Sequence, residues 1–183
     1  MFMKATLLRG ILIVGLLCGF ASATAAADLR INAFYGAFKG SGIAENADSL
    51  YFGATVRDLD VEIGADTSGR GFFVRWTTVI RSGGDPNNPN VRRKTQSVTF
   101  KNTDQTGVYR GEGSGDPLNG APYIWARISG QTLTVYILTI NKSGGYNMQS
   151  YARTLNAFGM DLVFSRIRDG EPVRQASAKL TKR

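Results

Sequence analysis

The stretch YIWARISGQTLTVYILTI, residues 123–140, contains two runs of β-branched and aromatic residues separated by Ser129 and Gly130. Runs of this composition favour β-strands. A two-residue connection that ends in glycine tolerates the positive φ that a tight hairpin turn demands. Two strands joined by so short a loop must run antiparallel, because a parallel pair needs a crossover of a dozen or more residues. This stretch therefore predicts a β-hairpin.

The same pattern continues through the chain from Asp28 onward. Short strand-like runs alternate with clusters of Gly, Asn, Asp and Ser, and no stretch shows a persuasive helical periodicity. The expected strands, about ten in number, cover residues 34–42, 54–63, 71–80, 95–101, 107–112, 123–128, 132–140, 146–155, 160–168 and 173–180. Because most connections are short, we expect an antiparallel meander.

Several of these strands are apolar on both faces. In residues 132–140, Leu133 and Val135 share one face while Tyr136 and Leu138 share the other. A meander of this kind suits a barrel closed on itself, which also removes the unpaired edges of an open sheet. We therefore predict an all-β fold in which eight to ten strands close into a single barrel domain over residues 28–183. A tightly closed β-sandwich is the alternative.

Residues 1–27 have a different composition. Lys4 and Arg9 precede an apolar run, residues 10–20, and a small-residue stretch follows that ends at Ala27. This is the three-part layout of a secretory signal peptide, and its apolar run is too short for a membrane-spanning helix. We expect cleavage after Ala27 and a periplasmic or secreted protein. The single cysteine of the chain, Cys18, falls within the segment that is removed.

The composition narrows the function classes. The 183 residues include no histidine, which excludes catalytic triads or dyads that need one, and also histidine metal sites. Paired carboxylates for glycoside hydrolysis are an open alternative, because the sequence does not show how far apart Asp58, Asp60, Glu62, Asp116 and Asp161 lie in space. We interpret them as surface residues and expect no enzyme, no cofactor and no metal. The formal net charge of +8 favours anionic partners such as lipid head groups, polysaccharides or acidic ligands. Nucleic acid is not expected, because the protein is predicted to be exported and shows no recognised binding motif.

Arginines are spread over the predicted strands, at Arg57, Arg75, Arg110, Arg127, Arg153, Arg166 and Arg174. By period-two counting, Arg57 shares a face with Leu59, and Arg127 shares one with Trp125. A cation on an apolar face near a strand end would lie at a cavity mouth, where guanidinium binds carboxylate or phosphate. The alternative is that these arginines lie on the outer wall and pair with Asp58, Asp60, Glu62 or Asp161.

Aromatic side chains would form the body of such a pocket, because ligand sites are mostly apolar with a few placed polar groups. The candidate ligand-binding residues are Arg57, Trp76, Trp125, Arg127, Tyr136, Tyr151 and Arg166. The same aromatics would equally well fill a dry core.

The first predicted strand carries a resemblance to a known family. In FYGAFKGSG, residues 34–42, Gly36 stands two residues before Phe38. This resembles the Gly-x-Trp opening of the calycin barrels, the lipocalin and avidin type, with Phe38 in the place of tryptophan. The resemblance implies an eight-stranded or similar barrel with an interior site, and it transfers no ligand. The chain also resembles small exported proteins of Gram-negative bacteria.

These observations favour an exported, non-enzymatic protein that holds a small apolar or amphipathic anion inside a β-barrel. The alternative is a structural or interaction module that meets an anionic surface of the cell envelope through basic segments such as residues 92–94 and the carboxyl end. A third hypothesis is an outer-membrane barrel. The charged face of residues 55–63 and the terminal Lys182-Arg183 argue against it.

Overall fold

The computed structural model describes residues 27–47, 53–81, 85 and 87–183. The predicted signal peptide, except for Ala27, lies outside these residues. No helix in the described part of the chain is both long and apolar enough to cross a membrane. The elements are η1 (Ile31–Phe34), β1 (Gly36–Asn46), β2 (Ala54–Ala65), β3 (Gly71–Arg81), β4 (Val91–Asn102), β5 (Val108–Gly111), η3 (Pro117–Asn119), β6 (Tyr123–Ser129), β7 (Thr132–Ile140), β8 (Tyr146–Asn156), β9 (Gly159–Arg168) and β10 (Glu171–Lys182).

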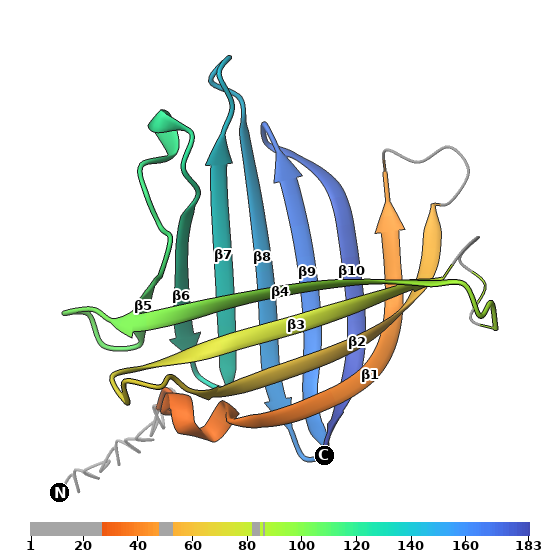
Figure 1. Cartoon of the computed structure of the whole chain (residues 1–183), viewed down its shortest axis with the longest axis horizontal. Helices are drawn as coiled ribbons and strands as arrows, with labels where there is room; N and C mark the ends of the chain where they lie inside the picture. Colours follow the sequence, from red (N-terminus) through yellow and green to blue (C-terminus); the bar gives the residue numbers. More distant parts are fainter. Residues whose placement is uncertain (1–26, 48–52, 82–84, 86) are drawn as a thin grey trace, which may run out of the picture.

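The strands form one closed antiparallel barrel. Each strand pairs with its neighbours in sequence, and β1 pairs with β10 to complete the cylinder, from Phe38 opposite Lys182 to Asn46 opposite Arg174. Figure 1 shows β1 to β4 crossing in front of β5 to β10 at a steep angle. The predicted all-β antiparallel barrel is confirmed, and continuous pairing around the cylinder excludes the sandwich.

The strand predicted over residues 95–101 begins earlier than expected. β4 starts at Val91, and Lys94 pairs with Thr78 of β3. Arg92, Arg93 and Lys94, which we treated as a basic segment beside a loop, therefore belong to the barrel wall. Lys94 faces the interior and Arg93 the outside, because successive residues of a strand point to opposite faces.

One end of the barrel is closed by apolar side chains. Helix η1 precedes β1 and places Phe34 in the core with no exposed surface. Nearby, Phe72 stacks on Phe100 with ring centroids 5.0 Å apart, and Tyr109 meets Phe72 edge-on at 4.9 Å. Because these side chains fill one end of the barrel, space for a cavity is left at the opposite end.

The seam between β1 and β10 depends on glycine. A Cβ atom at Gly40 would lie 1.9 Å from the carbonyl oxygen of Lys179, and one at Gly42 would lie 2.0 Å from that of Ser177. Both obstacles are backbone atoms, which cannot rotate away as a side chain does. The two strands can approach this closely only because neither position carries a side chain.

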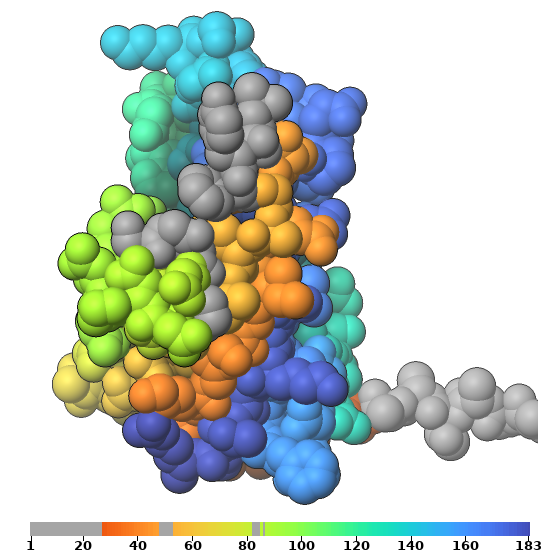
Figure 2. Space-filling view, turned by 90° about the vertical axis from the view of Figure 1, so that its right-hand side faces the viewer, coloured from red at the N-terminus to blue at the C-terminus, as the bar shows by residue number. Residues whose placement is uncertain are grey.

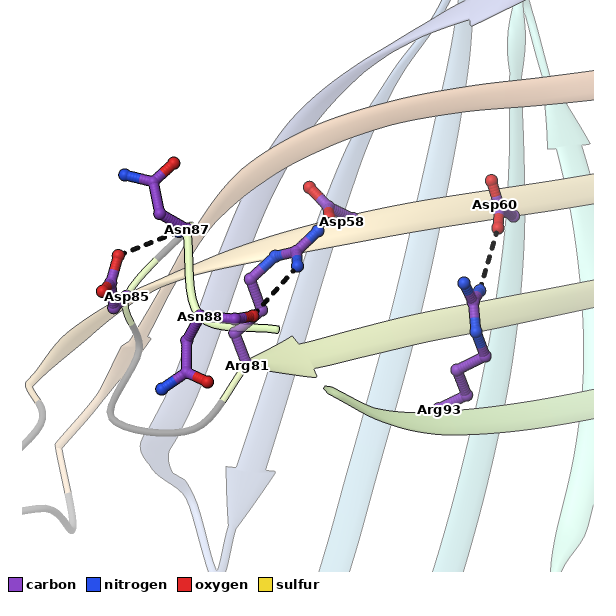
Figure 3. Close-up of polar contacts among 7 residues, drawn as sticks. All are labelled: Asp58, Asp60, Arg81, Asp85, Asn87, Asn88 and Arg93. Carbon is purple, nitrogen blue, oxygen red and sulfur yellow. Dashed lines mark hydrogen bonds and ion pairs between the residues drawn. The ribbon is translucent and has the colours of Figure 1, made fainter. Parts of the chain in front are cut away.

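The acidic face of β2 lies on the outside of the barrel. Arg81 at the end of β3 binds Asp58 at 2.7 Å, and Arg93 of β4 approaches Asp60 at 3.9 Å, as Figure 3 shows. Arg75 binds the third carboxylate of this face, Glu62, at 3.1 Å. The predicted cross-strand pairing on the wall is thus confirmed for Arg75. Alternation along β2 sends these carboxylates outward and leaves its interior face without acid.

Candidate functional site

A cavity of about 230 Å³ occupies the barrel end opposite η1. Its walls come from the end of β1, the start of β2, the later half of β3, the start of β4 and the adjoining parts of β8, β9 and β10. In the space-filling view the β7–β8 turn (cyan) forms the top of the molecule, and residues 87–90 with the start of β4 (light green) project on the near side (Figure 2).

The apolar part of the cavity is a cluster of three aromatic rings. Tyr151 lies between Trp76 and Phe164, with ring centroids 5.0 Å and 4.7 Å apart. Two glutamines that also line the cavity hold the polar atoms of these rings. Trp76 Nε1 donates to Gln96 Oε1 at 3.1 Å, and the Tyr151 hydroxyl donates to Gln149 Oε1 at 2.9 Å. The rings therefore present their apolar faces in fixed orientations.

Four cations line the same cavity, and no Asp or Glu is among its described lining residues. They are Arg57, Lys94, Arg166 and Arg174. None of the four forms an ion pair with a carboxylate in the described ranges. Their charges are therefore not neutralised by the barrel, and the cavity has a positive potential.

Neutral oxygens orient three of these cations. Arg57 Nε donates to Thr55 Oγ1 at 3.0 Å, and Arg166 Nε donates to Asn147 Oδ1 at 3.0 Å. Arg174 Nε donates in the same way to the Asn46 side chain. Each contact fixes one edge of a guanidinium group without cancelling its charge. The terminal nitrogens of each guanidinium group are donors with which arginine binds a carboxylate in a two-pronged contact.

The electrostatics of Arg57 reflect this crowding. Burial lowers the pKa of Arg57 below its usual value, and the neighbouring charges of Arg174 and Arg92 lower it further. Like charges held close together in a partly dehydrated site repel one another. A bound anion would relieve that repulsion.

A further arginine lies beneath the aromatic cluster. Arg153 of β8 is completely buried, and its guanidinium carbon is 5.3 Å from the ring centre of Trp76 and 5.6 Å from that of Tyr151. Its Nη1 donates to the Tyr151 carbonyl oxygen at 3.2 Å, whereas Nε and Nη2 have no hydrogen-bond partner. Burial lowers the pKa of Arg153 to about 10.

The structure divides the predicted site residues into two groups. Arg57, Trp76, Tyr151 and Arg166 lie together around the cavity. Trp125, Arg127 and Tyr136 lie on the outer face, so the expectation that they border an interior pocket is wrong. On β6 the inner positions belong to Ala126 and Ile128, both buried. Trp125 instead stacks on Tyr136 of β7 outside the barrel, with centroids 4.8 Å apart.

The sequence analysis did not assign two of the cavity cations, Lys94 and Arg174, to the site, nor the buried Arg153 beneath it. Lys94 was excluded because the strand was expected to begin at residue 95. Arg174 was recognised as a strand arginine but not assigned to the site. Arg153 follows Tyr151 by two residues, so the alternation of side chains along a strand is enough to place both residues on one face.

The fluorescence of the two tryptophans tests whether Trp76 lies inside the barrel and Trp125 on its outer face. In a Trp125→Phe variant only Trp76 remains, and because its side chain is 4% exposed we expect blue-shifted emission that resists acrylamide. In a Trp76→Phe variant the remaining Trp125 should be quenched several-fold more readily. Stern–Volmer quenching measures both variants. Equal quenching constants would show that the two tryptophans are not on opposite faces of the wall.

Comparisons with known proteins identify the fold. No protein-family model matches the chain, and no curated protein matches it. Among solved structures, a protein of unknown function from the DUF3598 family of Nostoc punctiforme superposes with a TM-score of 0.56 at 13% sequence identity. The superposition covers 87% of this chain and 51% of that chain, so this chain spans about half the length of its structural neighbour. At this identity the similarity concerns the fold alone.

Proposed function

We propose that the protein binds a small amphipathic anion inside the barrel and performs no chemistry on it. One observation carries the proposal: four cations without a described carboxylate partner surround a cavity whose remaining wall is largely aromatic and aliphatic. A positive, partly dehydrated pocket attracts an anion, and the rings offer an apolar surface to the rest of the ligand.

The size of the cavity limits the ligand. A buried apolar cavity of roughly 150 Å³ is known to hold benzene, and the cavity here is about 230 Å³. A ligand somewhat larger than benzene fits, such as a medium-chain fatty acid or a single-ring aromatic acid. Its carboxylate would lie near Arg57 and Arg166, with its apolar part against Trp76 and Tyr151.

Octanoate and 1-octanol test this proposal, because they share a chain and differ in charge. Hydrogen bonds to charged groups contribute about 1.5–3 kcal/mol, so we expect octanoate to bind at least about tenfold more tightly than octanol. An Arg166→Ala variant should weaken octanoate binding by about tenfold. Isothermal titration calorimetry measures each affinity.

Arg127→Ala is the matched control, because it removes an arginine from the outer wall and should leave octanoate affinity unchanged. Equal affinity for octanoate and octanol would contradict the proposal. So would an equal loss of octanoate affinity in the Arg127→Ala and Arg166→Ala variants.

Export and the calycin resemblance fit the same proposal. A cleaved signal peptide would place the barrel in the periplasm or outside the cell, where it would meet free amphiphiles. One detail of the first strand supports the resemblance. Phe38, the aromatic residue two positions after Gly36, is buried shortly after η1, and Lys182 Nζ lies 5.8 Å from its ring centre.

An interaction role at the cell envelope is the second candidate, supported by the outer wall. Tyr123, Trp125 and Tyr136 form a partly exposed row of rings there, and Arg110 lies over Tyr123 at 5.9 Å. Binding to phosphatidylglycerol vesicles that is lost in Arg127→Ala, together with no binding of octanoate, would favour this second role.

A further inference from the structure

Arg153 is the most unusual polar group in the described part of the protein. It is the one buried charged residue there, and two of its three guanidinium nitrogens have no partner. Its cross-strand neighbours are Leu133 of β7 and Leu162 of β9, both apolar. The outer carboxylates of β2 are already paired with Arg75, Arg81 and Arg93. No described acid therefore neutralises this charge.

Such an arrangement is costly for a protein. Burying a charge without a counter-charge is strongly unfavourable, and buried donors are nearly always satisfied. The contacts with the rings of Trp76 and Tyr151 compensate only in part, because they supply no acceptor for Nε and Nη2. The missing acceptor must come from outside the described part of the chain if these two nitrogens are to be satisfied.

We propose that Arg153 is a second anion site and that the ligand is a dianion, with two acidic groups joined by an apolar chain. One acidic group would bind the cations at the cavity mouth, and the other would reach Nε and Nη2 of Arg153. This inference rests on the proposed function, since it needs a ligand in the same cavity. It adds the ligand's class, an α,ω-dicarboxylate or similar molecule.

The spacing of the two cationic levels supports this ligand class. Arg166 pairs with Gln149 across β9 and β8, so these two residues lie at one level of the barrel. Arg153 follows Gln149 by four residues on β8, a separation of about 13 Å at the usual rise of a strand. The aromatic cluster of Trp76 and Tyr151 lies between the two levels. A ligand with a charge at each end and an apolar middle matches this arrangement of cations, aromatic rings and Arg153.

The rings of Trp76 and Tyr151 lie between the cavity and Arg153, so the ligand must displace one of them. The polar atom of each ring is held by a hydrogen bond to a glutamine, from Trp76 to Gln96 and from Tyr151 to Gln149. Displacement breaks that hydrogen bond and also the ring's contacts with its aromatic neighbours and with Arg153. The charge-assisted contact between the acid and the guanidinium group must offset both losses.

Octanedioate and octanoate test the inference on the unmodified full-length protein, because they have the same chain length and differ in one carboxylate. We expect octanedioate to bind at least about tenfold more tightly than octanoate in calorimetry. In an Arg153→Met variant the two affinities should agree within about twofold. Equal affinities in the unmodified protein overturn the inference, and this comparison does not depend on how the variant folds.

The outcomes separate the two proposals. If octanoate binds and octanedioate binds no better, the proposed function stands and the role of Arg153 is wrong. A preference for octanedioate that persists in Arg153→Met would place the second carboxylate at the mouth and also overturn the inference. If neither compound binds, the proposed function itself fails. An Arg127→Met variant, altered on the outer wall, should keep the full preference.

Discussion

A Gly40→Val variant is expected to lose much of its stability, because it places a side chain where β1 and β10 close the barrel. The new Cβ would lie 1.9 Å from the Lys179 carbonyl oxygen and 3.0 Å from the Leu180 Cα. Only separation of the strands relieves these contacts, and that breaks the hydrogen bonds of the seam. Overpacking costs 1–3 kcal/mol or more. We expect a loss of about 3 kcal/mol or more, at the upper end of that range.

Urea unfolding monitored by circular dichroism measures this loss. The control is Gly53→Val, because Gly53 is exposed, has no positive φ and has open space around its Cβ position. Its free energy of unfolding should change by no more than about 0.5 kcal/mol. A Gly40→Val protein as stable as the control would show that β1 and β10 are not paired in solution.

Arg153→Met should have the opposite effect and raise the stability of the ligand-free protein. Methionine fills a similar space without a charge or unpaired donors. The effective penalty for burying an ion is several kcal/mol. It exceeds the hydrogen bond to the Tyr151 carbonyl, about 1 kcal/mol, and the contacts with two rings, about 0.5–2 kcal/mol each. We expect a net gain of about 1–3 kcal/mol, or a rise in Tm of several degrees.

Thermal unfolding in the absence of ligand tests this expectation. Arg127→Met, on the outer wall, should change stability by less than about 0.5 kcal/mol. A fall in Tm for Arg153→Met of the size seen when a core side chain is removed would show that the guanidinium group stabilises the barrel. A rise would mean that the protein keeps a destabilising residue for a reason other than folding.

The architecture was largely predictable because it depends on local signals. Every expected strand is present, and turns such as Gly130-Gln131 and Asp169-Gly170 determine antiparallel neighbours. The first of these turns lies one residue later than the predicted Ser129-Gly130, because Ser129 still pairs with Thr132. Closure pairs β1 with β10 and so removes the two unpaired edges that an open meander would leave. The start of β4 was missed because Val91–Lys94 carries three successive cations. Pairing with β3 outweighs the weak strand propensity of these residues.

The site was predictable only in part, because alternation groups residues without showing which group faces inward. Arg127 and Trp125 do share a face, as expected, but on β6 the outer face carries the large rings while Ala126 faces inward. That choice depends on the volume available inside the barrel, which is set by Phe72, Phe100 and other strands far away in sequence. A single strand contains no such information.

The arrangement of charge explains how one short chain makes a positively charged cavity. On β2, alternation places Asp58 and Asp60 outside, where arginines of β3 and β4 neutralise them, and places Arg57 inside. The interior therefore collects cations while the acids are bound on the wall. Positive charge in the cavity follows from this separation and does not depend on the net charge of the protein.

A crystal structure with 8-bromooctanoate tests the central claim most directly, because the anomalous signal of bromine locates one end of the ligand. The account predicts bromine inside the barrel beside Trp76 and Tyr151, with the carboxylate within hydrogen-bond distance of Arg57 or Arg166. Bromine only on the outer wall near Trp125, with an empty interior, would contradict it.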